Sequence, residues 1–133
     1  MRDLKNHTVA AQSLAPAALV ASANGAWIDL LGANGAMVHF DIGAWTNGAF
    51  TLSVDDADET NQSDAAAVPA ANLEGALTVV DGAPDDNVIQ TVGYKGGKRY
   101  IRAVVTEPSS PNPGTGCVIG ASVVYSPLVR PAA

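Results

Sequence analysis

Cysteine is almost absent from this chain, and the one residue present excludes an intramolecular disulfide. Cys117 lies in the apolar stretch GCVIGASVV, which is typical of a small buried side chain. A catalytic thiol would need a positioned histidine, and the chain has only His7 and His39, neither within a supporting motif. The sequence therefore predicts a buried cysteine with no catalytic role.

Aromatic and charged residues are also scarce, and no long apolar run is present. Aromatic residues make up 5% of the chain and charged residues 15%, so the core should be thin and consist mainly of Val, Ile and Leu. A surface with so few charges suits a protein that covers part of it with partners. No apolar run reaches the roughly 18 residues of a membrane span, so no membrane partner is expected. Gln12, Ser13 and Pro16 interrupt the apolar N-terminal segment, which argues against a signal peptide and predicts cytoplasmic synthesis.

Positive charge is scarcer than negative charge, with seven Lys and Arg residues, 13 Asp and Glu residues and a formal net charge of −6. This balance argues against binding to duplex DNA or to an anionic membrane, both of which favour a basic face. Four basic residues nevertheless lie in the stretch GYKGGKRYIRAVVT, residues 93–106: Lys95, Lys98, Arg99 and Arg102.

Three interpretations of this basic cluster are open. It is either a solvated face that forms ion pairs with Asp residues, or a docking surface for an acidic protein, or a site for single-stranded nucleic acid. The third would use Tyr94 and Tyr100 as stacking platforms, but the net charge opposes it, so no nucleic-acid partner is expected.

Glycine-rich turns at regular spacing predict short antiparallel strands. Asn-Gly, a strong hairpin signal, occurs at residues 24–25, 34–35 and 47–48, and we expect a turn at each. One helical turn is expected at residues 73–75, and residues 55–72 are expected to form a surface loop. The predicted strands are, in order, 26–30, 36–42, 49–54, 76–80, 88–93, 99–106 and 117–125.

This pattern predicts an all-β fold, a single-domain antiparallel β-sandwich or jelly-roll-like barrel with extended N- and C-terminal arms. The domain covers residues 1–133. Residues 1–22 are expected to form an N-terminal arm or edge strand, and residues 126–133 an extended C-terminal tail.

Alternation along the predicted strands assigns core and solvent faces. His39 should face solvent, and so should Tyr100 and Arg102 on the strand of the basic cluster. The side chains expected to point inward are Val38, Phe40, Ile42, Phe50, Leu52, Val54, Ile101, Ala103 and Val105.

Motifs that carry chemistry are missing. The acidic run over residues 55–64 has neither the glycine nor the glutamate spacing of an EF-hand loop. Asp29 and Asp41 lie on neighbouring predicted strands, but alternating strands place such pairs together by chance. The chain contains no GxSxG, HExxH, P-loop or CxxC motif. We therefore expect a protein that is not an enzyme and that uses no cofactor and no metal.

Three stretches resemble a family of small structural proteins of tailed-bacteriophage virions. They are MRDLKNHTVAAQSLAPA, DIGAWTNGAFTLSVDDAD and, most strongly, IQTVGYKGGKRYIRAVVT. The resemblance covers nearly the whole chain, and its motifs are structural. It implies a capsid decoration (cement) protein that is made in the cytoplasm of the bacterial host and binds the major capsid protein on the virion surface.

On this interpretation the contacts come from the N-terminal arm and the basic cluster, and the chain assembles as a homodimer or homotrimer. The expected partner-binding residues are Leu4, Lys5, Leu14, Pro16, Lys95, Lys98, Arg99, Tyr100 and Arg102. Two alternatives stay open. The first is a head–tail connector or tail protein of the same virion, and the second is a carbohydrate-binding module with Trp27 and Trp45 as its aromatic platform.

Overall fold

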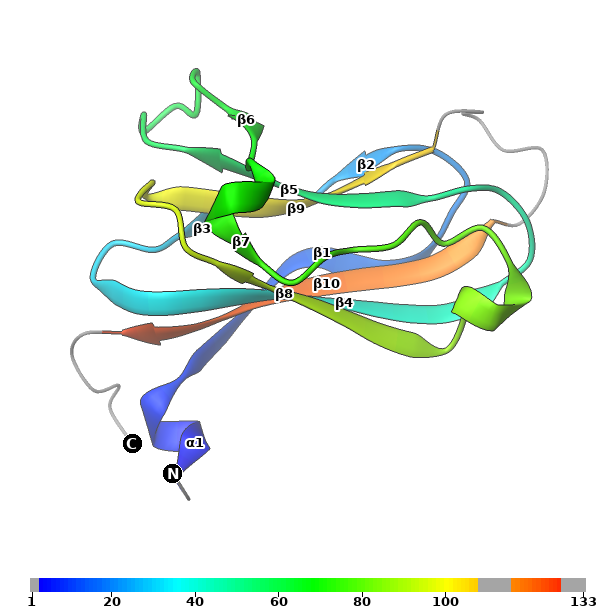
Figure 1. Ribbon diagram of the computed structural model, residues 1–133, viewed down its shortest axis with the longest axis horizontal. Helices are drawn as coiled ribbons and strands as arrows, with labels where there is room; N and C mark the ends of the chain where they lie inside the picture. Colours follow the sequence, from blue (N-terminus) through cyan, green and yellow to red (C-terminus); the bar gives the residue numbers. More distant parts are fainter. Residues whose placement is uncertain (1–2, 108–115, 128–133) are drawn as a thin grey trace.

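The computed structural model describes residues 3–107 and 116–127. Over these residues the chain forms two antiparallel sheets of five strands each, packed as a sandwich, with one short α-helix (Figure 1). The predicted all-β sandwich is confirmed. The two sheets do not close on each other, so the alternative of a jelly-roll-like barrel is wrong.

Long strands alternate with very short ones along the chain. In chain order the elements are α1 (Leu4–His7), β1 (Val9–Leu19), β2 (Ala23–Asn24), β3 (Ile28–Asp29), β4 (Ala33–Trp45), β5 (Thr51–Ala57), β6 (Ala66–Ala67), η1 (Ala70–Asn72), β7 (Leu73–Glu74), η2 (Ala83–Asp85), β8 (Val88–Tyr94), β9 (Tyr100–Thr106) and β10 (Cys117–Pro127).

The chain passes repeatedly between the two layers. Sheet A has the order β1–β10–β4–β8–β7, and sheet B has the order β2–β9–β5–β6 with β3 also paired to β9. The connections β3–β4 and β8–β9 therefore both cross from one sheet to the other. Each closes the same end of the sandwich, because Tyr94 at the end of β8 pairs with Ala36 near the start of β4.

The core lies between the sheets and is filled as the alternation predicts. All the side chains that were expected to point inward are buried, and Phe40, Phe50 and Ile101 have no exposed surface. Cys117 joins this core, and its burial raises the pKa of the thiol to about 11, which confirms the prediction of a buried cysteine. His39 is half-buried on the opposite side of β4, on the outer face of sheet A.

The prediction of hairpin turns at Asn24–Gly25 and Asn34–Gly35 is wrong. Gly25 is buried between β2 and β3 and donates its N–H to Ala103 O (2.7 Å), and a Cβ there would overlap Ser13 Oγ. Asn34 and Gly35 lie inside β4. Only Gly25 serves close packing, since a Cβ at Gly35 would meet no atom within 4 Å, and the tight turn falls instead at Gly32, where φ is +80°.

The third Asn-Gly pair does lie in a turn region, but the turn is not a hairpin. Gly48 has φ +97°, and Asn47 Oδ1 accepts the N–H of Gly116 (2.8 Å). The loop that contains them joins β4 of sheet A to β5 of sheet B, so it crosses between layers.

Residues 55–80 differ most from the expectations. Asp55–Ala57 belongs to β5 and is not part of a loop, and Leu73–Glu74 is the short strand β7 where a helical turn was expected. The predicted strand 76–80 is reduced to a single bridge between Phe50 and Val80. β7 is the edge strand of sheet A, where few neighbours reinforce a local preference.

The termini are less extended than predicted. Val9–Leu19 is an edge strand paired with β10, so the edge-strand alternative holds and no free arm covers these residues. β10 continues to Pro127, and the rest of the predicted tail, 128–133, lies outside the described residues. No helix in the part of the chain that the structure describes is long and apolar enough to cross a membrane.

Candidate functional site

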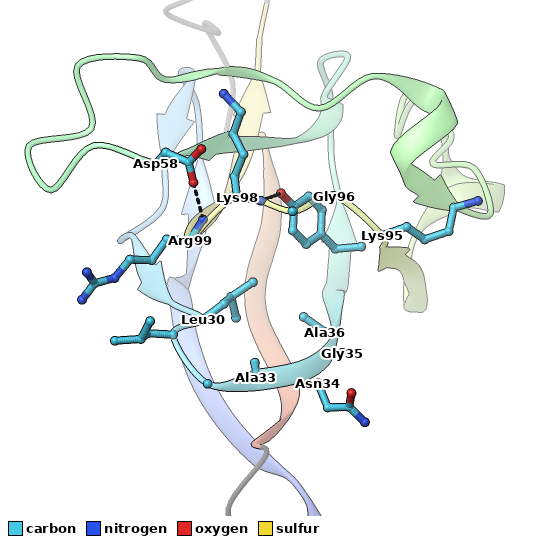
Figure 2. A pocket seen from close by; sticks show the side chains of 14 residues that line it. Leu30, Ala33, Asn34, Gly35, Ala36, Asp58, Lys95, Gly96, Lys98 and Arg99 are labelled. Atoms are coloured by element: carbon cyan, nitrogen blue, oxygen red, sulfur yellow. Dashed lines mark hydrogen bonds between the residues drawn. The ribbon is translucent and has the colours of Figure 1, made fainter.

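An open groove of about 380 Å³ lies at the end of the sandwich where the β3–β4 and β8–β9 connections cross between layers (Figure 2). Leu30 to Ala36 form one wall and Tyr94 to Arg99 the other, with Asp58 at the rim. Most of the lining is backbone, glycine, alanine and leucine. Leu31 is 74% exposed, which makes it the most exposed large apolar side chain in the described part of the chain.

Tyr94 fixes the shape of the β8–β9 turn. Its hydroxyl donates to Asp56 Oδ2 (2.9 Å) and accepts the backbone N–H of Lys98 (3.1 Å), and Asp56 is itself buried. Burial, followed by the hydrogen bond to Asp56, raises the pKa of Tyr94 well above its usual range, so the hydroxyl remains a donor. The chain passes so close to the ring at Gly96 that a Cβ there would lie 2.6 Å from two ring carbons.

Two backbone donors in this turn have no acceptor. The N–H groups of Gly96 and Gly97 form no hydrogen bond with any residue that the structure describes, whereas those of Lys95, Lys98 and Arg99 are all bonded. The groove therefore has free hydrogen-bond donors on one wall and the exposed side chain of Leu31 on the other.

Every residue of the basic cluster forms an ion pair within the chain. The pairs are Lys95–Glu74 (3.1 Å), Lys98–Asp64 (3.5 Å), Arg99–Asp29 (2.8 Å) and Arg102–Asp55 (3.1 Å). This confirms the interpretation of a solvated, ion-paired face. Since each cation is matched by a carboxylate, the cluster does not produce a positively charged surface.

The Arg99–Asp29 pair has the most favourable geometry of the four. Arg99 Nε donates to Asp29 Oδ1 (2.9 Å) and its Nη2 to Oδ2 (2.8 Å), which is the bidentate arrangement. This hydrogen bonding lowers the pKa of Asp29. The pKa of Asp64 is also lowered, because its carboxylate accepts the backbone N–H groups of Asp58 and Glu59.

These two shifts predict how stability depends on pH. A carboxyl group whose pKa is lower in the folded state stabilises the fold above its unfolded pKa and loses that contribution as pH falls through the folded value. We therefore expect the free energy of unfolding to fall as pH decreases from about 5 to 2, and the double variant Asp29→Asn/Asp64→Asn to fall less steeply. Urea unfolding at a series of pH values measures both slopes, and identical slopes would contradict the assignment.

Tyr100 does not lie on the surface as predicted. It is only 9% exposed, because β9 has neighbours on both sides at this position and the guanidinium of Arg99 covers the ring at 5.0 Å from its centroid. Tyr100 is therefore largely buried and lies beneath the guanidinium of Arg99. Arg102 does face outward from sheet B, where it stacks over Trp27 at 4.5 Å.

The N-terminal contact residues are separated by the structure. Leu4 and Lys5 are exposed on α1, which Figure 1 shows below the sandwich at the start of β1. Leu14 is half-buried and packs against the core. Pro16 lies on the outer face of sheet A, above Gly120.

Trp27 and Trp45 do not form one aromatic platform. Trp45 lies on β4 opposite Cys117, packs partly against the core and donates Nε1–H to Gly48 O (3.0 Å). Trp27 lies beneath Arg102 on sheet B. The two rings thus belong to different sheets.

Sequence reasoning missed Leu31 and the free donors of Gly96 and Gly97. The doublet Leu30-Leu31 was a usable signal for the first, since one residue of such a pair must leave the core. Among the described residues, no group of three or more His, Cys, Asp or Glu side chains is arranged to hold a metal ion.

Comparison with known proteins finds no matching family model, no similar curated protein and no similar solved structure. The resemblance to phage virion proteins therefore stays a prediction from the sequence motifs.

Proposed function

We propose that the chain is a non-enzymatic structural protein of a tailed-bacteriophage virion, a capsid decoration protein that binds the shell of the major capsid protein and stabilises the head. The motif resemblance supports this role, and so does a fold whose groove is lined mainly by backbone and small apolar residues. The observation that carries the proposal is the groove between the β3–β4 and β8–β9 connections.

This groove fits an extended segment of a protein neighbour. Carbonyl groups of such a segment can accept the free N–H groups of Gly96 and Gly97, as in recognition by strand addition. An apolar side chain of the segment packs against Leu31, which is otherwise exposed to solvent. Leu4 and Lys5 lie at the same end of sheet A and extend the contact surface, since Val9 pairs with Tyr125 and Tyr125 with Ala36.

The basic cluster sets the orientation of this contact more than its strength. Lys95 is exposed and Lys98 half-buried, and each is held by a single ion pair, so a carboxylate of the capsid competes with Glu74 and Asp64 for them. Exposed pairs of this kind contribute little to affinity, but they disfavour wrong registers and change the association rate.

Heads of the encoding phage, assembled without this chain, test the proposal. Adding the purified chain should make it sediment with the heads and raise the temperature at which they release DNA. Leu31→Asp should weaken binding by about tenfold or more, because the substitution places a charge in the apolar part of the contact. Val79→Asp, at an exposed position outside the groove, is the matched control.

Two results would contradict the proposal. In the first, heads without the chain release DNA at the same temperature as complete heads and do not bind it. In the second, the chain sediments with isolated tails or connectors, which would favour the head–tail or tail alternative.

A further inference from the structure

The groove at the end of the sandwich offers three kinds of contact that the described chain leaves unused. The backbone N–H groups of Gly96 and Gly97 have no acceptor among the described residues. Leu31 is a large apolar side chain exposed to solvent. Asp58 is the one carboxylate that lines the groove, and it forms no ion pair with a described residue. A matching occupant therefore supplies carbonyl groups, an apolar side chain and a cation.

Asp58 is fixed at the rim of the groove while its charge stays uncompensated. Its Oδ1 accepts the backbone N–H of Arg99 (3.0 Å), and its own N–H donates to the carboxylate of Asp64 (3.0 Å). The side chain of Arg99 pairs with Asp29, and that of Lys98 with Asp64, so neither of these cations forms an ion pair with Asp58. Its carboxylate is available to a cation from elsewhere.

Strand β10 ends beside this groove. Pro127, its last residue, pairs with Ala33, and Ser126 pairs with Gly35, and both partners line the groove. Tyr125 packs against the core, so its side chain points toward the space between the two sheets. Since residues two apart on a strand share a face, Pro127 points the same way. The chain therefore leaves β10 at one wall of the groove.

The residues that follow β10 carry the groups that the groove lacks. Residues 128–133 read LVRPAA, in which Leu128 and Val129 are apolar and Arg130 is the one basic residue. A residue before proline favours an extended backbone, which applies to Arg130. Three extended residues span about 10 Å, and the side chain of Arg130 adds to that reach.

We propose that residues 128–130 lie extended in the groove of their own chain when the protein is free. Leu128 packs against Leu31 near the start of this segment. Arg130 forms an ion pair with Asp58, which lies across the groove from the wall where β10 ends (Figure 2). Between these two contacts, backbone carbonyls of the segment accept the free N–H groups of the β8–β9 turn.

The covalent link favours the chain's own segment over a separate molecule. A segment tethered a few residues from its site has an effective concentration on the order of millimolar. A contact of one apolar side chain, two hydrogen bonds and one exposed ion pair is too weak to hold a free peptide at micromolar concentration, but it can hold a tethered one. The docking concerns the free chain and does not rest on the proposed role in a virion.

One consequence does rest on the proposed function. The docked segment and the capsid segment then compete for the same groove. The apparent affinity for the capsid is reduced to the fraction of chains whose groove is uncovered. Releasing the segment by substitution should therefore strengthen binding to heads.

Amide hydrogen exchange of the full chain, followed by nuclear magnetic resonance, tests the docking. The N–H groups of Gly96 and Gly97 should exchange about tenfold or more slowly than exposed amides. Leu128→Asp should remove this protection, because it places a charge against Leu31. Ala133→Asp, which adds the same charge to the same stretch beyond the contact, should leave the protection unchanged. The amides of the core strands report in the same spectra that each variant is folded.

A double-mutant cycle tests the pairing of Arg130 with Asp58. Arg130→Gln and Asp58→Asn each remove one charge, and asparagine keeps a side-chain oxygen that can accept the N–H of Arg99. Each substitution alone should reduce the protection by about threefold, the size expected of an exposed ion pair. The double variant should reduce it no further than either single variant.

Exchange of Gly96 and Gly97 at the rate of exposed amides in the full chain would overturn the proposal. So would protection that Leu128→Asp leaves intact, because another segment would then cover these amides. Protection that grows between about 20 μM and 500 μM chain would also overturn it, since the segment would then come from a second copy. Additive effects in the cycle would overturn the pairing of Arg130 with Asp58. None of these measurements involves heads, so a failure of the proposed function would leave them unchanged.

Discussion

Replacing Phe40 with alanine is expected to lower the free energy of unfolding by about 3–5 kcal/mol. Phe40 is fully buried at the centre of β4, which pairs with β10 on one side and β8 on the other. Removing its ring leaves a cavity in a core that has few aromatic side chains to refill it. Urea unfolding monitored by circular dichroism measures the change.

Two further variants make this result interpretable. Phe40→Leu keeps an apolar side chain and should cost less than Phe40→Ala. Leu31→Ala, at an exposed position, should change the free energy of unfolding by less than about 0.5 kcal/mol. Equal effects of Phe40→Ala and Leu31→Ala would show that the described core does not hold the sheets together.

Replacing Gly96 with alanine is expected to destabilise the chain by about 2–4 kcal/mol, because the ring of Tyr94 must move. A Cβ at this position lies 2.6 Å from two ring carbons. Displacing the ring breaks the hydrogen bond that the Tyr94 hydroxyl donates to Asp56 Oδ2. The buried Asp56 carboxylate then loses this donor. The groove should change shape as well, since Tyr94 also holds the backbone N–H of Lys98.

Gly97→Ala is the matched control for this prediction. A Cβ at Gly97 meets no atom within 4 Å, and neither glycine has a positive φ. Gly97→Ala should therefore stay within about 1 kcal/mol of the original chain. Unfolding midpoints in urea compare the two variants directly, and equal midpoints would show that the ring does not constrain the turn.

The layered fold could be predicted from the sequence because core positions alternate strictly in the central strands. Along β4, along β9 and along β5 with the residue before it, three residues spaced two apart point inward, and every one of them is buried. The short edge segments could not be predicted in this way. β7 and the bridge at Val80 depend on neighbours from distant parts of the chain, and local propensity does not report them.

The turns show how one local signal has two physical uses. Asn-Gly predicts a hairpin because both residues tolerate positive φ. Gly25, in contrast, is needed because Ser13 approaches its backbone closely, and Gly35 lies within a strand. The sequence does not distinguish a glycine that serves close packing from one that serves a turn.

At the candidate site, the sequence predicted that the basic cluster forms ion pairs, but not which carboxylates supply them. The turn over residues 95–99 does lie at an exposed groove. The four cations of the basic cluster, three in this turn and Arg102 in β9, are matched by the carboxylates of Asp29, Asp55, Asp64 and Glu74. Only the three-dimensional fold brings these carboxylates together, because the pairs are separated by between 21 and 70 residues in the sequence.

A density map of the intact virion by electron cryo-microscopy tests the proposed function most directly. The proposal predicts density for this β-sandwich on the outer surface of the head, with the groove between Leu31 and Gly96 facing the major capsid protein. Density confined to the neck or the tail, or no density for the chain anywhere on the particle, would contradict it.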